Sequence, residues 1–221
     1  MKITVIGASG RVGSRVVREA ADRGHEVTAI IRDPSQRHAL PAGVASRVAD
    51  ASGADAVAAL AAGQDVVVNA TRPVPGADEQ TITLTRAILD GTARVGARLI
   101  IAGGAAVLRI PGTDRLLLDD PHYLPPAYHA IGEASALQHA VCRQHGRGDW
   151  VYLCPPADLA PGVRTGRYRR GGDTLLVDAD GRAAISMEDL AVALVDEAEQ
   201  PRAEGHVFTV AGTEPQAAAT R

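Results

Sequence analysis

Aromatic residues are scarce in this sequence: one Trp, one Phe and four Tyr make up 3% of its 221 residues. Proteins that bind single-stranded nucleic acid stack bases on aromatic side chains, so this chain offers few platforms for them. Its charge gives no other reason to expect such a partner, because 26 acidic residues against 23 basic ones leave a net charge of −3. We therefore expect no nucleic acid among its partners.

Cysteine is also rare, and long apolar runs are missing. Cys142 and Cys154 are too few for a disulfide scaffold, and we expect two reduced thiols that pack as small hydrophobic groups. No uninterrupted apolar stretch approaches the length of a membrane span, so we expect no membrane partner. A strand that begins at Lys2 leaves no room for a signal peptide, and the sequence therefore predicts a cytoplasmic protein.

What the sequence does contain is an alternation of short apolar runs with helical patterns. Most of these runs are apolar at nearly every position, which is typical of strands buried on both faces of a parallel sheet. In the segment after the first run, Val16, Val17 and Ala20 fall on one face of a helix, and Gly24 is placed to end it. The expected strands are 2–7, 26–31, 45–49, 65–70, 98–103 and 150–154. Repeated strand–helix–strand units predict an α/β fold with a Rossmann-like, doubly wound parallel sheet.

The pattern changes after Cys154. The stretch 155–166 is rich in Pro and Gly and predicts an ordered loop, while 166–170 and 173–178 predict short strands. Ser186 is expected to cap a helix over 186–200, and a last strand is expected over 205–212, before a frayed tail. We interpret residues 1–221 as one domain in which about 155–221 form a small portion that covers the substrate side.

The first strand is followed by "GASGRVG", which places Gly7, Gly10 and Gly13 where a strand ends and a helix begins. The free backbone N–H groups and the dipole of a helix N-terminus bind anions. In such a loop the first glycine allows a tight turn, the second lets a pyrophosphate approach the backbone, and the third lets helix and strand pack closely. The spacing is GxxGxxG rather than GxGxxG, but its position after an N-terminal strand predicts a dinucleotide site.

The end of the second strand helps to choose between NADP and NAD. An acidic residue there would bind the ribose 2′-hydroxyl, but the strand ends in Arg32, whose guanidinium can bind a 2′-phosphate. Arg11 in the glycine loop could add a second positive charge. These two positive charges make NADP the expected cofactor. Asp33 could still serve NAD, which is the less favoured cofactor.

Other cofactor contacts are expected at the ends of the following strands. Asp50 is placed to meet the adenine edge, and residues 69–71 to lie near the pyrophosphate and ribose. In full, the residues expected from position to bind the cofactor are Gly7, Ser9, Gly10, Arg11, Val12, Gly13, Arg32, Asp50, Ala51, Asn69, Ala70, Thr71 and Gly103.

These motifs together resemble those of the atypical short-chain dehydrogenase/reductases. The resemblance is strongest to small NAD(P)H-binding proteins labelled NADH-flavin reductases, which are relatives of NmrA-like proteins and of biliverdin/flavin reductase. It covers nearly the whole chain and is most specific in "IIAGGAAVL", "WVYLCPPADLAPGVRTGRYRRG" and "GRAAISMEDLAVALVDE". The resemblance implies that the Pro-rich loop after the sixth strand borders the nicotinamide, which adds Pro155, Pro156 and Ala157 to the expected cofactor contacts.

The sequence departs from these enzymes in its catalytic residues. Their usual set is a Ser after strand five and a Tyr-x-x-x-Lys on the next helix, where the Tyr donates a proton to the substrate. Here strand five is followed by "GGAAVL", Tyr128 is followed four residues later by Gly132, and Tyr123 by Ala127. Carbonyl reduction by this route is therefore poorly supported.

A flavin or quinone-like acceptor needs no positioned acid, because solvent can supply the proton. We therefore expect an NADPH-dependent reductase of such an acceptor, acting as a monomer or homodimer. His122, Tyr128 and His129 are the candidate catalytic residues, and His129 could act as an acid near neutral pH.

Two other functions stay open. One is a non-catalytic NADP(H)-binding sensor, and the other is a biosynthetic ketoreductase or isomerase with a different active site. No metal site is expected, because Cys142 and His145 lack further ligands at metal spacing.

Overall fold

A computed structural model describes residues 1–203 and 206–213, and its centre is an eight-stranded sheet. The strand order is β3-β2-β1-β4-β5-β6-β10-β8, and every neighbouring pair is parallel except β8, which runs antiparallel to β10. The chain reverses its direction of progress across the sheet between β1 and β4, which confirms the doubly wound, Rossmann-like fold. The strands are β1 (Lys2–Ile6), β2 (Glu26–Ile31), β3 (Ala45–Val48), β4 (Val66–Asn69), β5 (Arg98–Ala102), β6 (Trp150–Cys154), β8 (Tyr168–Gly171) and β10 (Val207–Gly212).

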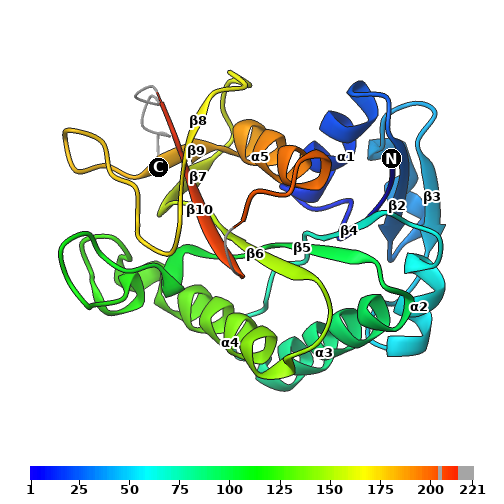
Figure 1. Cartoon of the computed structure of the whole chain (residues 1–221), viewed down its shortest axis with the longest axis horizontal. Coiled ribbons are helices and arrows are strands. Elements are labelled where there is room, and N and C mark those ends of the chain that lie inside the picture. The colour runs from blue at the N-terminus through cyan, green and yellow to red at the C-terminus, as the bar shows by residue number, and fades with distance from the viewer. Residues whose placement is uncertain (204–205, 214–221) are drawn as a thin grey trace.

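Helices cover both faces of this sheet (Figure 1). Helices α1 and α5 lie on one face, and α2, α3 and α4 on the other. Each layer closes over its own apolar core, because strands such as β4 and β6 are buried at every position and present side chains to both sides. The helices are α1 (Gly13–Asp22), α2 (Ala54–Ala61), α3 (Asp78–Val95), α4 (His129–His145) and α5 (Met187–Glu199).

The portion after β6 is where the structure differs most from the sequence-based expectation. The expected strand over 173–178 is wrong: Thr174 makes only an isolated bridge to Arg109, and the next residue, Leu175, is buried in the core without a partner strand. The expected loop 155–166 instead contains β7 (Asp158–Ala160), which pairs in parallel with β9 (Ala184–Ser186). Of the expected last strand and tail, residues 205 and 214–221 lie outside the described part of the chain.

Two other local expectations are confirmed. The Ser186 hydroxyl accepts a hydrogen bond from the backbone N–H of Asp189 at 2.9 Å and so caps α5. Both cysteines are free and buried, and burial raises the pKa of the Cys142 thiol to about 12.

The register of the sheet brings the ends of distant strands to one edge. Ile6 at the end of β1 pairs with Ile30 on one side and with Asn69 on the other. Asn69 in turn pairs with Ile101 of β5. The segments that follow β1, β2, β4 and β5 therefore leave the sheet side by side at its carboxyl edge, where ligands bind in folds of this kind.

Candidate cofactor-binding site

The three glycines after β1 are required for different reasons. Gly7 has φ +81°, and a Cβ there would lie 2.9 Å from the backbone of Ala70. A Cβ at Gly13 would lie 2.1 Å from the carbonyl oxygen of Gly7, so a side chain there would separate α1 from the loop. Gly10 is exposed, and its Cβ would meet only Gly7 O at 3.2 Å and Ala70 O at 3.9 Å. The protein's own packing thus explains Gly7 and Gly13, whereas Gly10 leaves open space in front of the loop.

Several backbone N–H groups of this loop have no hydrogen-bond acceptor in the described part of the protein. No described residue accepts a hydrogen bond from the N–H of Ser9, Arg11, Val12 or Gly13. Helix α1 begins after Val12, which has no side chain that could cap it, and no other side chain does so. An uncapped helix N-terminus next to several free N–H groups fits the negative charge of a pyrophosphate.

The end of β2 carries a free positive charge. The guanidinium of Arg32 is exposed and makes no hydrogen bond or ion pair with any described residue. Asp33 is occupied locally, because its carboxylate accepts the N–H of Ser35 at 2.8 Å and caps the 3-10 helix Pro34–Ala39. The hydrogen bonds from Ser35 lower the pKa of Asp33 below its usual range. Of the two residues considered for the ribose, Arg32 is therefore the one left available.

Asp50, after β3, is also engaged in its own turn. Its carboxylate accepts the hydroxyl of Ser52 at 2.7 Å and the N–H of the same residue at 2.9 Å. These bonds, and more weakly the nearby charge of Arg32, lower its pKa. Asp50 is exposed and Ala51 is buried, so the Asp50 carboxylate remains on the surface close to the charge of Arg32.

The residues after β4 form the opposite wall of the glycine loop. Asn69 is buried, and its side-chain oxygen accepts the N–H of Thr71 at 3.0 Å and the hydroxyl of Thr71 at 2.7 Å. This fixes the turn that brings the Ala70 carbonyl against Gly7. Asn69 and Thr71 thus shape the loop, and Ala70 lies against its first glycine.

The residues that the resemblance adds lie on the far side of the same edge. Pro155 and Pro156 are buried, and Ala157 is exposed. Gly103, after β5, is required by packing, because a Cβ there would lie 1.9 Å from the ring of Tyr152. Because Pro155 and Pro156 are buried, Ala157 is the one of these three residues that is most accessible to a ligand.

Tyr152 pairs with Ile101 near the end of β5, but it is unsuited to proton transfer. It is fully buried, and its hydroxyl oxygen lies 3.2 Å from the N–H of Gly104, the carbonyl of Ser135 and the side-chain oxygen of Gln138. Burial raises its pKa well above the usual value for a tyrosine. We assign it a structural role.

The three candidate catalytic residues lie at the start of α4 and in the loop before it. Tyr128 is 51% exposed, His122 is exposed with its ring edge-on to Tyr123 at 4.8 Å, and the Nδ1 of His129 lies 3.6 Å from the Glu133 carboxylate. None of them has a buried partner that would fix it as an acid.

In this chain Gly132 stands where the lysine of a Tyr-x-x-x-Lys pair would be, and other side chains fill the space beside it. Gly132, four residues after Tyr128, is buried, and a Cβ there would lie 2.6 Å from Cδ2 of Leu124 and 3.2 Å from Cδ1 of Leu118. A lysine at this position would force the end of the Leu124 side chain, and to a smaller extent that of Leu118, to move. The loop before α4 therefore fills the place that the lysine of a Tyr-x-x-x-Lys pair would take.

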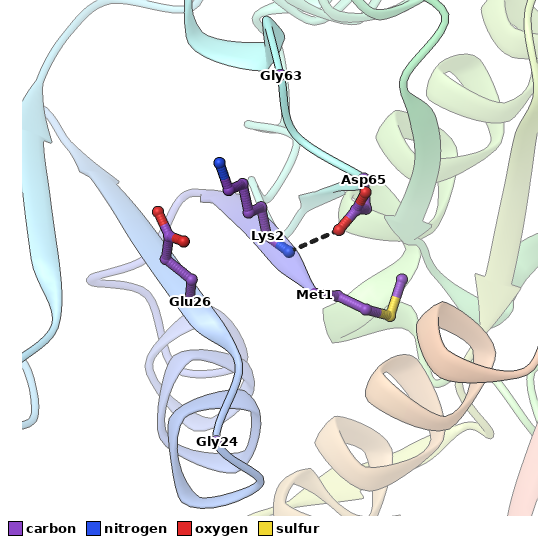
Figure 2. A pocket seen from close by; sticks show the side chains of 6 residues that line it. All are labelled: Met1, Lys2, Gly24, Glu26, Gly63 and Asp65. Carbon is purple, nitrogen blue, oxygen red and sulfur yellow. Dashed lines mark hydrogen bonds between the residues drawn. The ribbon is translucent and has the colours of Figure 1, made fainter.

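The described part of the chain also has hollows outside the glycine loop, of which two stand out. One of about 230 Å³ is lined by Leu118, Leu124 and His129, among others. The other, of about 520 Å³, lies at the amino-terminal ends of β1 and β2, the edge opposite the glycine loop (Figure 2). Lys2, Glu26 and Asp65 line it, and the N–H of Lys2 donates to Asp65 at 2.8 Å. It has neither the free N–H groups nor the helix N-terminus of the glycine loop, so we do not assign the cofactor there.

Within residues 1–203 and 206–213, no helix is long and apolar enough to cross a membrane. No group of three His, Cys, Asp or Glu side chains there could hold a metal ion. His145, considered above beside Cys142, instead contacts the Asp90 carboxylate at 2.9 Å.

Sequence reasoning did not identify the acidic residues that connect α5 to the site. Asp189 is buried and accepts the backbone N–H groups of Thr165 and Gly166, each at 2.8 Å. Glu188 bonds to Arg15 of α1 at 2.6 Å and to the N–H of Gly162 at 2.7 Å. Acidic side chains are common in the first turn of a helix because they interact favourably with its dipole, and the partners of these two are far away in the sequence, so their position alone does not reveal this role.

The fold and the loop together define a Rossmann-type nucleotide-binding protein, and comparison with known proteins gives its family. Residues 7–201 match the NAD(P)H-binding family, and the chain belongs to this family of oxidoreductases. This confirms the resemblance seen in the sequence.

Individual relatives extend over almost the whole chain. The Bacillus subtilis protein YwnB, whose function is uncharacterised, is 32% identical over 212 residues, which are 95% of this chain and 98% of YwnB. A Bacteroides thetaiotaomicron structure, provisionally named an epimerase, is 37% identical with a TM-score of 0.85, and the match covers 97% of this chain and 98% of that one. A Streptococcus pneumoniae structure, provisionally named an NADH-flavin reductase, is 26% identical with a TM-score of 0.80 over 96% of this chain and 100% of that one.

Proposed function

We propose that this protein is an NADPH-dependent reductase that passes a hydride to a flavin or quinone-like acceptor. The observation that carries the proposal has two parts. The glycine loop has free backbone N–H donors, and the position of a catalytic lysine holds Gly132, which is packed against two leucines. The loop fits a pyrophosphate, while Leu124 and Leu118 occupy the space beside Gly132 that a catalytic lysine would need. An acceptor that takes its proton from solvent suits such a site better than a carbonyl does.

The preference for NADPH rests on the end of β2. Asp33 is occupied by its cap, whereas Arg32 has a guanidinium free to form charge-assisted hydrogen bonds with a 2′-phosphate. Arg11 in the glycine loop is also exposed, and its guanidinium has no partner among the described residues. Two free cations at this edge favour the more highly charged cofactor.

The residues of the chain would then bind and orient rather than exchange protons. The N–H groups of the glycine loop would hold the pyrophosphate, and Ala157 would contribute to the wall beside the nicotinamide. The reduced nicotinamide supplies the hydride when it is bound. Proximity and orientation are the main contributions that we assign to the protein.

The provisional name of the Streptococcus pneumoniae relative supports the acceptor class. The exposed and weakly partnered Tyr128 and His129 also suit a second function, a sensor that binds NADP(H) without turnover. The two functions differ in one measurable respect, the oxidation of bound NADPH when an acceptor is added.

The test has two stages. Binding of NADPH and NADH is measured first by calorimetry, and NADPH oxidation is then followed with FMN, FAD, a quinone or no acceptor under anaerobic conditions. Oxidation that depends on flavin or quinone supports the reductase. Tight binding without oxidation by any of these acceptors would instead identify a sensor, and oxidation only with carbonyl compounds would overturn the proposed acceptor class.

A further inference from the structure

One side chain connects the glycine loop to the helix on the other side of the site. Arg15 lies in the first turn of α1, and its Nη1 donates to the carbonyl oxygen of Arg11 at 2.7 Å. Its Nε donates to Oε1 of Glu188, in the first turn of α5, at 2.6 Å. Both side chains are about a quarter exposed, at 26% and 23%. The glycine loop is thus held by a residue that is itself held by α5.

The bond to Arg11 has a consequence for the cofactor donors. The backbone N–H of Arg15 bonds to Val12, so the carbonyl of Arg11 receives no backbone hydrogen bond and depends on the Arg15 guanidinium and a long bond of 3.4 Å from Ser14. In a planar trans peptide the C=O and the next N–H point in opposite directions. Fixing the Arg11 carbonyl toward Arg15 therefore aims the N–H of Val12 away from the helix, to the side where the free donors lie.

Glu188 also binds the segment that follows β7. Its other oxygen accepts the backbone N–H of Gly162 at 2.7 Å, and the neighbouring Asp189 accepts those of Thr165 and Gly166. The segment 162–166, which follows β7, is therefore attached to the first turn of α5 by three hydrogen bonds from its backbone N–H groups to side-chain carboxylates. One of them shares its carboxylate with Arg15.

We propose that Arg15 and Glu188 are positioning residues that couple cofactor binding at the glycine loop to the order of segment 162–166. The inference rests on the cofactor site proposed above. An anion bound to the Val12 N–H favours the peptide orientation that Arg15 stabilises, and this in turn favours the Arg15–Glu188 pair and the Gly162 bond. Coupling of this kind is reciprocal, so a loosened segment lowers the affinity for the cofactor.

The experiment compares wild type, Arg15→Gln, Glu188→Gln and the double variant by calorimetry with NADPH. Glu199→Gln is the matched control, because Glu199 joins the same two helices at their other ends through Arg23, at 2.8 Å and with similar exposure. We expect Arg15→Gln and Glu188→Gln each to weaken NADPH binding about fivefold to tenfold, the value of one hydrogen bond. The double variant should be no weaker than the worse single variant, and the control should stay within about twofold.

A second readout follows the segment itself. Trypsin cleavage after Arg164, identified by mass spectrometry, is timed with and without NADPH. NADPH should slow this cleavage in wild type and in Glu199→Gln, and should have a smaller effect in Arg15→Gln. Thermal melts of each variant without NADPH separate a general loss of stability from a loss of coupling.

The outcomes are distinct. If wild type and Glu199→Gln bind NADPH and the two site variants bind it equally well, the positioning role is wrong while the cofactor site stands. Equal protection of Arg164 by NADPH in wild type and Arg15→Gln would also overturn the coupling. If wild type binds neither NADPH nor NADH, the cofactor site is wrong and the positioning role falls with it.

Discussion

Replacing Gly10 by alanine should separate the cofactor role of the glycine loop from its structural role. The added methyl group would meet only Gly7 O at 3.2 Å and Ala70 O at 3.9 Å, so the protein itself accommodates it with small shifts. We expect the free energy of unfolding to change by less than about 1 kcal/mol. Gly13→Ala is the contrasting variant, because its methyl group would lie 2.1 Å from Gly7 O, and it should cost about 3 kcal/mol or more.

The effect of Gly10→Ala on the cofactor should be much larger than its effect on the fold. A methyl group in front of the loop keeps a pyrophosphate away from the free N–H groups of residues such as Arg11 and Val12. Losing two hydrogen bonds to a charged group costs about 3–6 kcal/mol, which corresponds to roughly a hundredfold to ten-thousandfold in Kd.

Thermal melts with and without NADPH measure both quantities at once. At about 100 times its Kd, NADPH should stabilise wild type by about 2.7 kcal/mol and raise Tm by about 5–11 °C. Gly10→Ala should melt near the wild-type temperature without NADPH and show almost no increase with it. A Gly10→Ala protein that retains the full NADPH shift would refute the assignment of this space to a pyrophosphate, and the loop would be only a structural turn.

Three further predictions concern the cofactor preference, the acceptor and acid stability. Arg32→Ala should reduce the preference for NADPH over NADH by about tenfold, since one charged hydrogen bond contributes about 1.5 kcal/mol or more; titration of both cofactors tests this, and an unchanged ratio removes Arg32 from the site. Tyr128→Phe and His129→Ala should each lower flavin reduction less than about tenfold, because loss of a true general acid costs about 10²–10⁴-fold; a thousandfold loss at unchanged NADPH affinity would indicate a protonated carbonyl substrate instead. Hydrogen bonds from Arg164, with a smaller contribution from Arg23, hold the pKa of Glu19 below its ordinary value of 4.5 although burial opposes this. A lowered folded-state pKa means that this stabilisation is complete above the unfolded-state value and is lost as the pH falls through the folded-state value. The Tm advantage of wild type over Glu19→Gln should therefore shrink in acid, and a difference that stays constant from about pH 7 to about pH 3 would contradict it.

Much of the fold could be predicted from the sequence because its signals are local. Strands buried on both faces are apolar at nearly every position, so β1, β2, β4, β5 and β6 can be recognised as short apolar runs. Gly7 likewise predicts a turn, because glycine tolerates a positive φ, and Ser186 predicts a helix cap, because its hydroxyl can accept a backbone N–H. The loop that follows β1 was therefore predicted at its correct place.

The portion after β6 could not be predicted in the same way. The apolar run at 175–177 has the composition of a strand, yet it forms none in the structure: Leu175 is buried in the core, next to a single bridge at Thr174. In contrast, the short strands β7 and β9 pair with each other from positions about two dozen residues apart, although β7 lies in a Pro-rich stretch. Short runs carry too little local preference to choose a partner, so burial and the neighbouring segments decide.

The sequence by itself determined the class of this protein: a parallel sheet with a glycine loop for a dinucleotide and without a Tyr-x-x-x-Lys pair. Only the tertiary structure decided how the loop is held and what fills the place of the missing lysine. Arg15 and Glu188 are 173 positions apart in the chain, and nothing local links them. Leu124 fills the space beside Gly132 because a loop folds back over α4. Such contacts depend on which surfaces meet after folding, and the composition and spacing of each segment do not contain that information.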